Sequence, residues 1–311
     1  MKDSCDIISA FCSDAAKEKL LHIYNNLEKQ GLIPHGVEFK QNGFDVENNN
    51  LFFISFNKNI ERSLQSLMNK TDFKKCQIII VSDDEENFFN FAMEYNICNI
   101  VHINNLSEIL LRGILKRFLT ENSSLEVFFD EKTNVFDKRY YISGNICMQN
   151  FIENTFGDFI DKLKNTVKTT FIINCHELVT NAIAYGVLGI SAQVRDRKAS
   201  DIGRYINIPE EKKVEIHLLM NEEFYGISAM DFSGTLTVNR ILERIRRQSI
   251  VAGETIPQGI EDHTGRGLAI LSHHGILVFS IKRGVFTTVS LISQVNESFE
   301  RKPLSILATE L

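Results

Sequence analysis

The chain has 311 residues, of which 43% are hydrophobic and 24% are charged, and it carries a net charge of −6 at pH 7. This length favours two domains, and the composition is that of an ordinary globular protein. The negative charge gives no overall attraction to nucleic acid or to an anionic membrane surface. No apolar run reaches the ~20 residues that span a bilayer, and the N-terminus lacks a signal-peptide core. We therefore expect a cytoplasmic protein that binds neither nucleic acid directly nor membranes.

The six cysteines form no CxxC pair and have no metal-like spacing with histidine. They are Cys5, Cys12, Cys76, Cys98, Cys147 and Cys175. Most of them lie in apolar runs, where a free thiol behaves as a small hydrophobic side chain. We expect reduced, structural cysteines, as in a cytosolic protein.

Residues 1–120 alternate between short apolar runs and stretches of helical periodicity. The expected strands are 6–11, 36–39, 51–56, 76–81 and 99–103, and the expected helices are 15–30, 60–69, 86–95 and 106–119. Continuously apolar strands separated by helices are typical of a parallel sheet covered on both faces. We therefore predict an α/β domain over 1–120. The Asn-rich segment between the second and third strands reads as a loop where a crossover helix is short or missing.

This order of elements resembles the receiver domain of two-component response regulators, which has a flavodoxin-like parallel sheet. Ser82 matches a hydroxyl position of the family, but the other functional residues differ. Ser55 stands in place of the phosphoacceptor aspartate, Asp14 is the one acid left after the first strand, and His102 lies near the position of the lysine. Without a set of carboxylates, Mg²⁺ has no oxygen cage. We expect a pseudo-receiver that acts by docking, or else a generic flavodoxin-like domain used for dimerisation.

From about residue 125 the pattern changes to paired helices and antiparallel strands. The expected strands are 125–131, 136–143, 214–220, 225–231, 275–281 and 286–292, and the expected helices are 145–164 and 169–185. Consecutive helices with such strands predict an α/β sandwich with a mixed, mostly antiparallel sheet over 125–295. Residues 296–311 are expected to form a C-terminal tail. The apolar helix 145–164 suits either a homodimer interface or the core.

The segment HELVTNAIAYG places an acid and an amide on one face of the second long helix. Glu177 and Asn181 are four residues apart and share this face with Asn174 and Tyr185, opposite an apolar stripe. Gly186 is expected to end the helix as a C-cap glycine. A carboxylate and an amide that project from a packed helix suit a metal ion and a water beside a phosphate.

Two further motifs follow in the second half of the chain. An apolar strand ends in Asp231, whose carboxylate suits the exocyclic amine of adenine, and Gly234 lies in the turn that follows. The third motif opens an apolar helix with the residues Gly265, Arg266, Gly267 and Leu268. Two close glycines at a helix start allow backbone N–H groups to approach a polyphosphate.

In this order the motifs resemble the GHKL ATPase domain of gyrase, Hsp90, histidine kinases and MutL, and in particular its anti-sigma-factor serine kinase branch. The first motif of that branch, E-L-x-x-N-A-x-x-H-G, is matched except that Tyr185 replaces the histidine. Asp231 matches the adenine-binding aspartate. The D-x-G-x-G pattern is broken, because Ser233 and Thr235 occupy its glycine positions and Gly234 is shifted by one.

The resemblance implies ATP and Mg²⁺ as cofactors. It implies Glu177 as the catalytic general base and Asn181 as the metal ligand. The nucleotide-binding residues that it implies are Asn181, Tyr185, Asp231, Gly234, Gly265, Arg266, Gly267, Leu268 and Thr288.

With no acceptor histidine upstream, the resemblance implies a bacterial signal-transduction protein that phosphorylates a serine or threonine of a partner regulator, or sequesters that regulator. The partner would be an anti-sigma antagonist, a sigma factor or another regulator. Two alternatives stay open. The altered loop after Asp231 suits a degenerate, non-catalytic binding module, and a catalytic subunit that phosphorylates histidine in trans is the other.

Two connecting segments add to this picture. Residues 240–262 lie where the family has a mobile ATP lid, and they contain Arg240, Arg244, Arg246 and Arg247. These arginines suit either phosphate contact or a solvated helical face. The charged insertion 189–213 suits either a partner-docking surface or a solvated loop.

Overall fold

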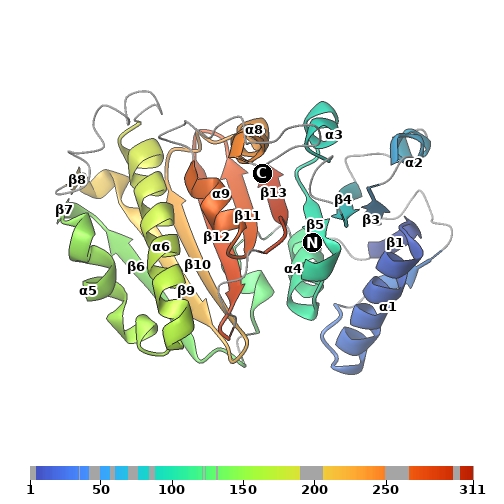
Figure 1. The fold of residues 1–311 in the computed structure, drawn as a ribbon, viewed down its shortest axis with the longest axis horizontal. Coiled ribbons are helices and arrows are strands. Elements are labelled where there is room, and N and C mark those ends of the chain that lie inside the picture. Colours follow the sequence, from blue (N-terminus) through green and yellow to red (C-terminus); the bar gives the residue numbers. More distant parts are fainter. Residues whose placement is uncertain are drawn as a thin grey trace. The chain divides into compact units, whose positions relative to one another are not determined.

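The computed structural model describes residues 5–34, 36–41, 50–56, 60–68, 76–83, 88–120, 122, 124–130, 132–189, 206–248, 266–296 and 302–310. The chain divides into two units, Met1–Phe129 and Asp130–Leu311. Each unit combines a β-sheet with helices, so the fold class is α/β (Figure 1). None of the described helices has the length and apolar character needed to cross a bilayer.

The first unit has a parallel sheet with the strand order β2-β1-β3-β4-β5. The strands are β1 (Cys5–Phe11), β2 (Val37–Lys40), β3 (Asn50–Ser55), β4 (Cys76–Ser82) and β5 (Ile100–His102). The helices are α1 (Asp14–Lys29), α2 (Ile60–Met68), α3 (Phe88–Glu94) and α4 (Glu108–Thr120), with the 3₁₀ helix η2 (Ile103–Asn105) after β5. Every strand and helix expected over 1–120 is confirmed, with ends shifted by one or two residues. Most of the loop expected between β2 and β3 lies outside the described residues.

The strand expected at 125–131 is wrong, because a 3₁₀ helix, η3 (Leu125–Phe128), forms there instead. Its apolar residues pack on α4 rather than pairing with another strand. The Phe128 ring lies so close to Gly113 that a Cβ there would be 2.0 Å from a ring carbon. In addition, Arg112 donates a 2.6 Å hydrogen bond to the Phe128 carbonyl. Through these contacts the apolar segment of η3 packs against α4 and stabilises its position.

The second unit has a mixed sheet with the strand order β13-β11-β12-β10-β9-β6. Its strands are β6 (Phe136–Ile142), β9 (Val214–Met220), β10 (Phe224–Asp231), β11 (Ile276–Lys282), β12 (Phe286–Gln294) and β13 (Ile306–Glu310). Only the β11–β13 pair is parallel, and the other pairs are antiparallel. The main helices are α5 (Met148–Ile160), α6 (Asn165–Asn181), α8 (Val238–Gln248) and α9 (Arg266–Ser272). Figure 1 shows α5, α6 and α9 against one face of this sheet.

Three short strands of the second unit were not expected. β7 (Gly144–Ile146) pairs with β8 (Ile206–Ile208), so α5 begins three residues later than the helix expected from 145. β8 is followed by a 3₁₀ turn, η5 (Glu210–Lys212), within the segment expected as an insertion. The expected C-terminal tail contains β13, which pairs with β11. These pairings join segments far apart in sequence, and local periodicity carries no signal for them.

Helix α6 is fixed against the sheet by aromatic and polar contacts in the core. The Phe171 ring packs against Tyr225 of β10, with ring centroids 5.6 Å apart. Asn174, expected on the polar face of this helix, is fully buried instead. Its Nδ2 donates to the Tyr225 hydroxyl at 3.4 Å, and its Oδ1 lies 2.6 Å from Nδ1 of His274. Burial raises the Tyr225 pKa to about 12 and lowers the His274 pKa, so both groups are neutral at pH 7.

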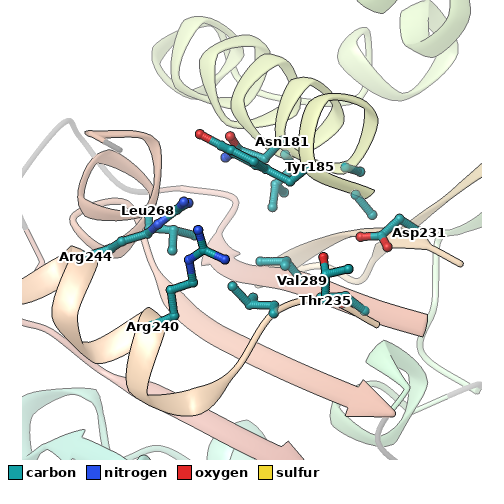
Figure 2. A pocket seen from close by; sticks show the side chains of 13 residues that line it. Asn181, Tyr185, Asp231, Thr235, Arg240, Arg244, Leu268 and Val289 are labelled. Atoms are coloured by element: carbon teal, nitrogen blue, oxygen red, sulfur yellow. The ribbon is translucent and has the colours of Figure 1, made fainter. Parts of the chain in front are cut away.

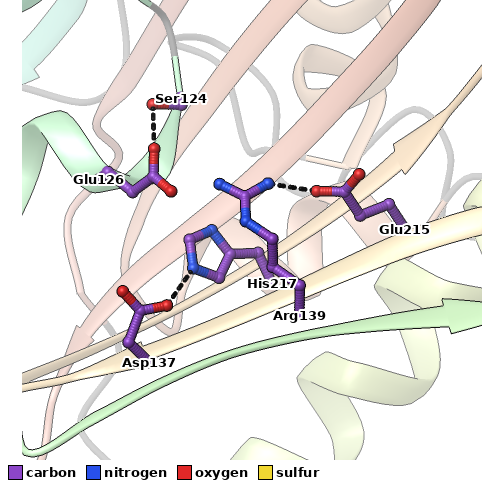
Figure 3. Close-up of polar contacts among 6 residues, drawn as sticks. All are labelled: Ser124, Glu126, Asp137, Arg139, Glu215 and His217. Atoms are coloured by element: carbon purple, nitrogen blue, oxygen red, sulfur yellow. Dashed lines mark hydrogen bonds and ion pairs between the residues drawn. The ribbon is translucent and has the colours of Figure 1, made fainter.

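The other face of the second sheet carries cross-strand polar pairs (Figure 3). Nε2 of His217 on β9 lies 2.8 Å from Oδ1 of Asp137 on β6. Arg139 on β6 forms an ion pair with Glu215 on β9. Alternation places these side chains opposite Tyr140, whose ring packs on Phe156 of α5. Such pairs fix the register of the edge strand β6.

The C-terminal strand also holds the start of α8. An Oε atom of Glu310 on β13 accepts a 3.2 Å hydrogen bond from the backbone N–H of Val238, the first residue of α8. The other carboxylate oxygen lies 3.5 Å from Arg283. A carboxylate at a helix N-terminus satisfies a free N–H group and complements the helix dipole. β13 is therefore part of the support for α8.

We predict that Glu310→Ala lowers the free energy of unfolding by about 1 kcal/mol, because the substitution removes a helix N-terminal hydrogen bond together with its charge. Glu310→Gln should cost less, since an amide oxygen still accepts the bond. Urea denaturation measures both effects. Glu222→Ala, in the exposed β9–β10 turn, is the matched control. An equal loss in Glu310→Ala and Glu222→Ala would contradict the assigned role.

Candidate functional site

The second unit contains a pocket at the ends of β10 and β12, bounded by α6, α8 and α9 (Figure 2). About 620 Å³ of space lies between its walls, and this volume includes the open mouth and the solvent there. Most of its wall is apolar: Leu178, Ala182, Ala229, Leu236, Leu268 and Val289. Its polar and charged residues come from segments far apart in sequence.

The helix that carries the first motif changes geometry inside the motif. α6 ends at Asn181 and continues as a π-helix, η4 (Ala182–Val187). Both Asn181 and Tyr185 line the pocket. The expected C-cap role of Gly186 is wrong, because the left-handed residue after the helix is Gly189, with φ of 59°. Gly186 is instead a point of close approach, where an added Cβ would lie 2.2 Å from Cγ of Asp231.

Asp231 ends β10 at one side of the pocket and is 7% exposed. Its Oδ1 accepts a 2.9 Å hydrogen bond from the backbone N–H of Ser233 and a second bond from the Ser233 hydroxyl. Burial raises the pKa of this carboxyl group, and the hydrogen bonds from Ser233 oppose that shift. The serine in the altered loop therefore holds the aspartate side chain in place.

Gly234 allows the backbone of this loop to adopt a left-handed conformation and to pack closely on a neighbouring turn. Its φ of 58° lies in the left-handed region that favours glycine. A Cβ on Gly234 would lie 2.3 Å from the Lys282 carbonyl oxygen, and the Gly234 carbonyl accepts a 3.2 Å bond from the Gly284 N–H. Gly234, expected to contact nucleotide, therefore docks the loop on the β11–β12 turn, and Thr235 and Leu236 are the loop residues that line the pocket.

The strand pairing brings a different threonine to the pocket from the one expected. The antiparallel register places Thr287 of β12 directly opposite Asp231. Thr287 and Val289 line the pocket, whereas Thr288 belongs to the other face of the strand. Thr287 is 3% exposed, and its hydroxyl has no hydrogen-bond partner among the described residues. An unsatisfied buried hydroxyl in a pocket wall suits a ligand that supplies the missing bond.

The first and third motifs lie in contact. A Cβ added to Gly267 on α9 would lie 2.2 Å from Oε2 of Glu177 and 3.1 Å from Nδ2 of Asn181. Leu268 lines the pocket, and Arg266 is exposed. The structure thus brings Glu177, Asn181, Tyr185, Asp231, Gly267 and Leu268 into one region. Gly265 lies outside the described residues.

Helix α8 contributes two arginines, for which the sequence was compatible with either a phosphate contact or a solvated helical face. Arg240 and Arg244 line the pocket, and the Arg244 guanidinium carbon lies 4.7 Å from the centroid of the Tyr185 ring. The apolar face of α8 is buried. In Figure 2 the two arginines lie on one side of the pocket, and Asp231 with Thr235 lies on the other. The pocket is therefore electrostatically polarised.

The donor set near the pocket suits a metal ion that is carried by an anionic ligand. Within the described ranges, no group of three or more acidic, histidine or cysteine side chains is placed to hold a metal by itself. Next to Gly267, Glu177 supplies a carboxylate and Asn181 supplies a side-chain amide, whose Nδ2 is the atom nearer to the glycine. Mg²⁺ is usually held by one or two protein oxygens together with substrate phosphates. These residues therefore fit Mg²⁺ only together with such phosphates.

In the first unit, hydroxyl groups occupy the strand ends where a receiver carries carboxylates. Ser55 accepts a 2.8 Å hydrogen bond from the Ser13 N–H and donates to the Ser13 hydroxyl at 3.2 Å. The thiol of Cys12 donates to the Phe53 carbonyl, and burial raises its pKa to about 12. His102 accepts from the Asn104 N–H through Nδ1. These bonds hold the loops together without a charged group.

We predict that Gly186→Ala lowers the free energy of unfolding by about 1–3 kcal/mol, because the new methyl group overlaps the Asp231 side chain. Urea denaturation measures this change. Gly157→Ala in α5 is the control, since a Cβ there meets nothing within 4 Å. Asp231→Gly in the same chain should relieve much of the overlap, because it removes both the Cγ at 2.2 Å and the Cβ at 2.3 Å from the new methyl group. A Gly186→Ala variant as stable as the wild-type protein would refute the close approach.

Comparison of the sequence with models of known protein families finds no match, and comparison with curated proteins finds none either. The function is therefore argued from the pocket and from the residues that meet there.

Proposed function

We propose that the second unit is a GHKL-type ATP-binding domain that acts as a serine/threonine protein kinase of the anti-sigma-factor kinase kind. The observation that carries this proposal is the meeting of three motifs at one pocket. Asp231 ends β10, Asn181 ends α6, and Leu268 lies on α9, and all three line the same cavity. Their order along the chain and their position around the pocket both agree with the resemblance.

The Asp231 side of the pocket suits a purine base. The Asp231 carboxylate accepts from an exocyclic amine, and the unsatisfied Thr287 hydroxyl donates to or accepts from a ring nitrogen. The surrounding wall is apolar, which favours a flat ring over water. The fixed loop at Ser233 keeps the acceptor in position before the base arrives.

The Glu177 side suits phosphoryl transfer. Glu177 is half-buried beside Gly267, where its carboxylate is placed to take the proton of an incoming serine or threonine hydroxyl. Asn181, one helical turn further along, would hold Mg²⁺ through its amide oxygen. When bound, Mg²⁺ neutralises the charge that develops on the transferred phosphoryl group. The protein itself fixes the positions of the acid and the amide on one rigid helix.

The first unit supports a regulatory role. Its parallel order 2-1-3-4-5 is the flavodoxin-like order that receiver domains also have. Because hydroxyl groups replace the carboxylates at the strand ends, the proposed role is docking of a partner rather than phosphotransfer. We propose a cytoplasmic regulator, such as an anti-sigma antagonist or a sigma factor, as the protein partner, and a homodimer as the assembly.

One observation favours a second candidate function, a binding module that has lost catalysis. Ser233 and Thr235 stand at the glycine positions of the second motif, and Ser233 occupies one oxygen of Asp231. A carboxylate already bonded in this way has less capacity to accept from a base. In this case the second unit sequesters its regulator without using nucleotide.

We predict that ATP with Mg²⁺ binds with measurable heat in a calorimetric titration, and that Asp231→Asn weakens binding about tenfold by removing a charged acceptor. Because burial raises the Asp231 pKa, affinity should fall as the pH drops towards that raised pKa, where the carboxylate becomes protonated. Thr288→Ser, on the other face of β12, is the control. No heat at millimolar nucleotide would favour the binding module instead.

We predict that Glu177→Gln abolishes transfer of label from γ-labelled ATP to a candidate regulator while nucleotide binding persists. The amide retains the shape of the side chain but has no basic oxygen to accept the hydroxyl proton. His176→Gln, at the exposed neighbouring position, is the control and should retain transfer. Labelling that survives Glu177→Gln would remove Glu177 from the role of base.

A further inference from the structure

Two arginines on one face of α8 line the pocket, and no carboxylate among the described residues forms an ion pair with either of them. Arg240 and Arg244 are separated by four residues and therefore lie on the same side of the helix. Within the described part of the chain, neither forms an ion pair, and the neighbouring Glu243 is exposed. Two uncompensated guanidinium groups beside a pocket create a site for an anion.

Tyr185 positions one of these arginines. The Arg244 guanidinium lies over the Tyr185 ring at 4.7 Å from the centroid. A cation–π contact uses the flat face of the guanidinium and leaves its in-plane N–H donors available to an oxyanion. Tyr185 belongs to η4, which is continuous with α6, so the ring is anchored to the helix that carries Glu177.

The glycine motif on α9 is a less favourable site for an anion than the sequence predicts. The place that a side chain of Gly267 would take is filled by the Glu177 carboxylate, which is itself negative. α9 is only seven residues long, and Arg266 is exposed and does not line the pocket. Among the residues that the structure describes, the positive charge that faces the pocket therefore comes from α8.

We propose that Arg240 and Arg244 bind the phosphate groups of the nucleotide, with Tyr185 as the positioning residue for Arg244. This inference rests on the proposed nucleotide site, and it adds the orientation of the ligand, with the base at Asp231 and the phosphates at α8. It also adds a specificity, because a nucleotide with more phosphate groups should bind to the pocket more tightly than one with fewer. Since guanidinium charge is permanent, binding persists when divalent cations are removed.

The wild-type protein provides the first test. Calorimetric titration with adenosine, ADP and ATP, each with Mg²⁺ and with EDTA, should give affinities that rise with phosphate number in both buffers. Raising the salt concentration should weaken ATP binding and leave adenosine binding unchanged, because screening acts on the charged contacts. Loss of ATP binding in EDTA, or equal affinity for adenosine and ATP, would overturn the proposal.

Matched variants provide the second test. Arg240→Gln and Arg244→Gln should each weaken ATP binding about tenfold or more, the range for hydrogen bonds to charged groups, with adenosine binding unchanged. Arg247→Gln makes the same charge change on the same helix outside the pocket and is the control. Tyr185→Phe should retain the ratio of ATP to adenosine affinity, and Tyr185→Leu should lower it because the ring is lost.

The outcomes separate this inference from the proposed function. If no variant and no condition gives nucleotide binding, the proposed nucleotide site fails and this inference fails with it. If ATP binds but Arg240→Gln and Arg244→Gln have no more effect than Arg247→Gln, the nucleotide site stands and the role of α8 is refuted. Should an arginine variant fail to fold, the salt and EDTA titrations of the wild-type protein still decide.

Discussion

The close packing of α6 and η4 against the rest of the second unit is the constraint on which the site depends. The fully buried side chain of Asn174 fixes the helix to Tyr225 and to the partly buried His274 through hydrogen bonds. Because such bonds are directional and costly to leave unmade in the core, they fix the rotation of the helix as well as its position. One turn later Glu177 meets Gly267, and beyond it Gly186 meets Asp231. The absence of a side chain at these two glycines lets three motifs approach one pocket.

The pocket built on this packing combines an acceptor at one side with positive charge at the other. Asp231 is buried, and Ser233 holds its carboxylate, so the acceptor is fixed in advance. Arg240 and Arg244 stand on α8, whose first N–H bonds to Glu310 of the C-terminal strand. A polar ligand with an uncharged base and an anionic tail matches this distribution. The support for α8 thus reaches from the last strand of the chain to the phosphate side of the proposed site.

The first unit combines a parallel sheet with uncharged hydrogen bonds at two of its strand ends. Its strands follow the parallel order β2-β1-β3-β4-β5, and β3 is buried at every position. Ser13 and Ser55 bond to each other where a phosphoacceptor site would require carboxylates. The hydrogen bonds close the loops, which favours a surface used for contact over a site used for phosphotransfer.

Sequence patterns alone predicted the strands and helices of the first unit and the long helices and central strands of the second. They also singled out Glu177, Asn181 and Asp231 as candidate site residues. Those features depend on periodicity and on local spacing, which can be recognised from residues that are close together in the sequence. The tertiary structure alone decided that Thr287 rather than Thr288 faces the pocket, and that Gly186 serves close packing rather than helix termination. It also decided that 306–310 form a strand of the sheet. These outcomes depend on strand register and on contacts between distant segments, and no local pattern encodes either of them.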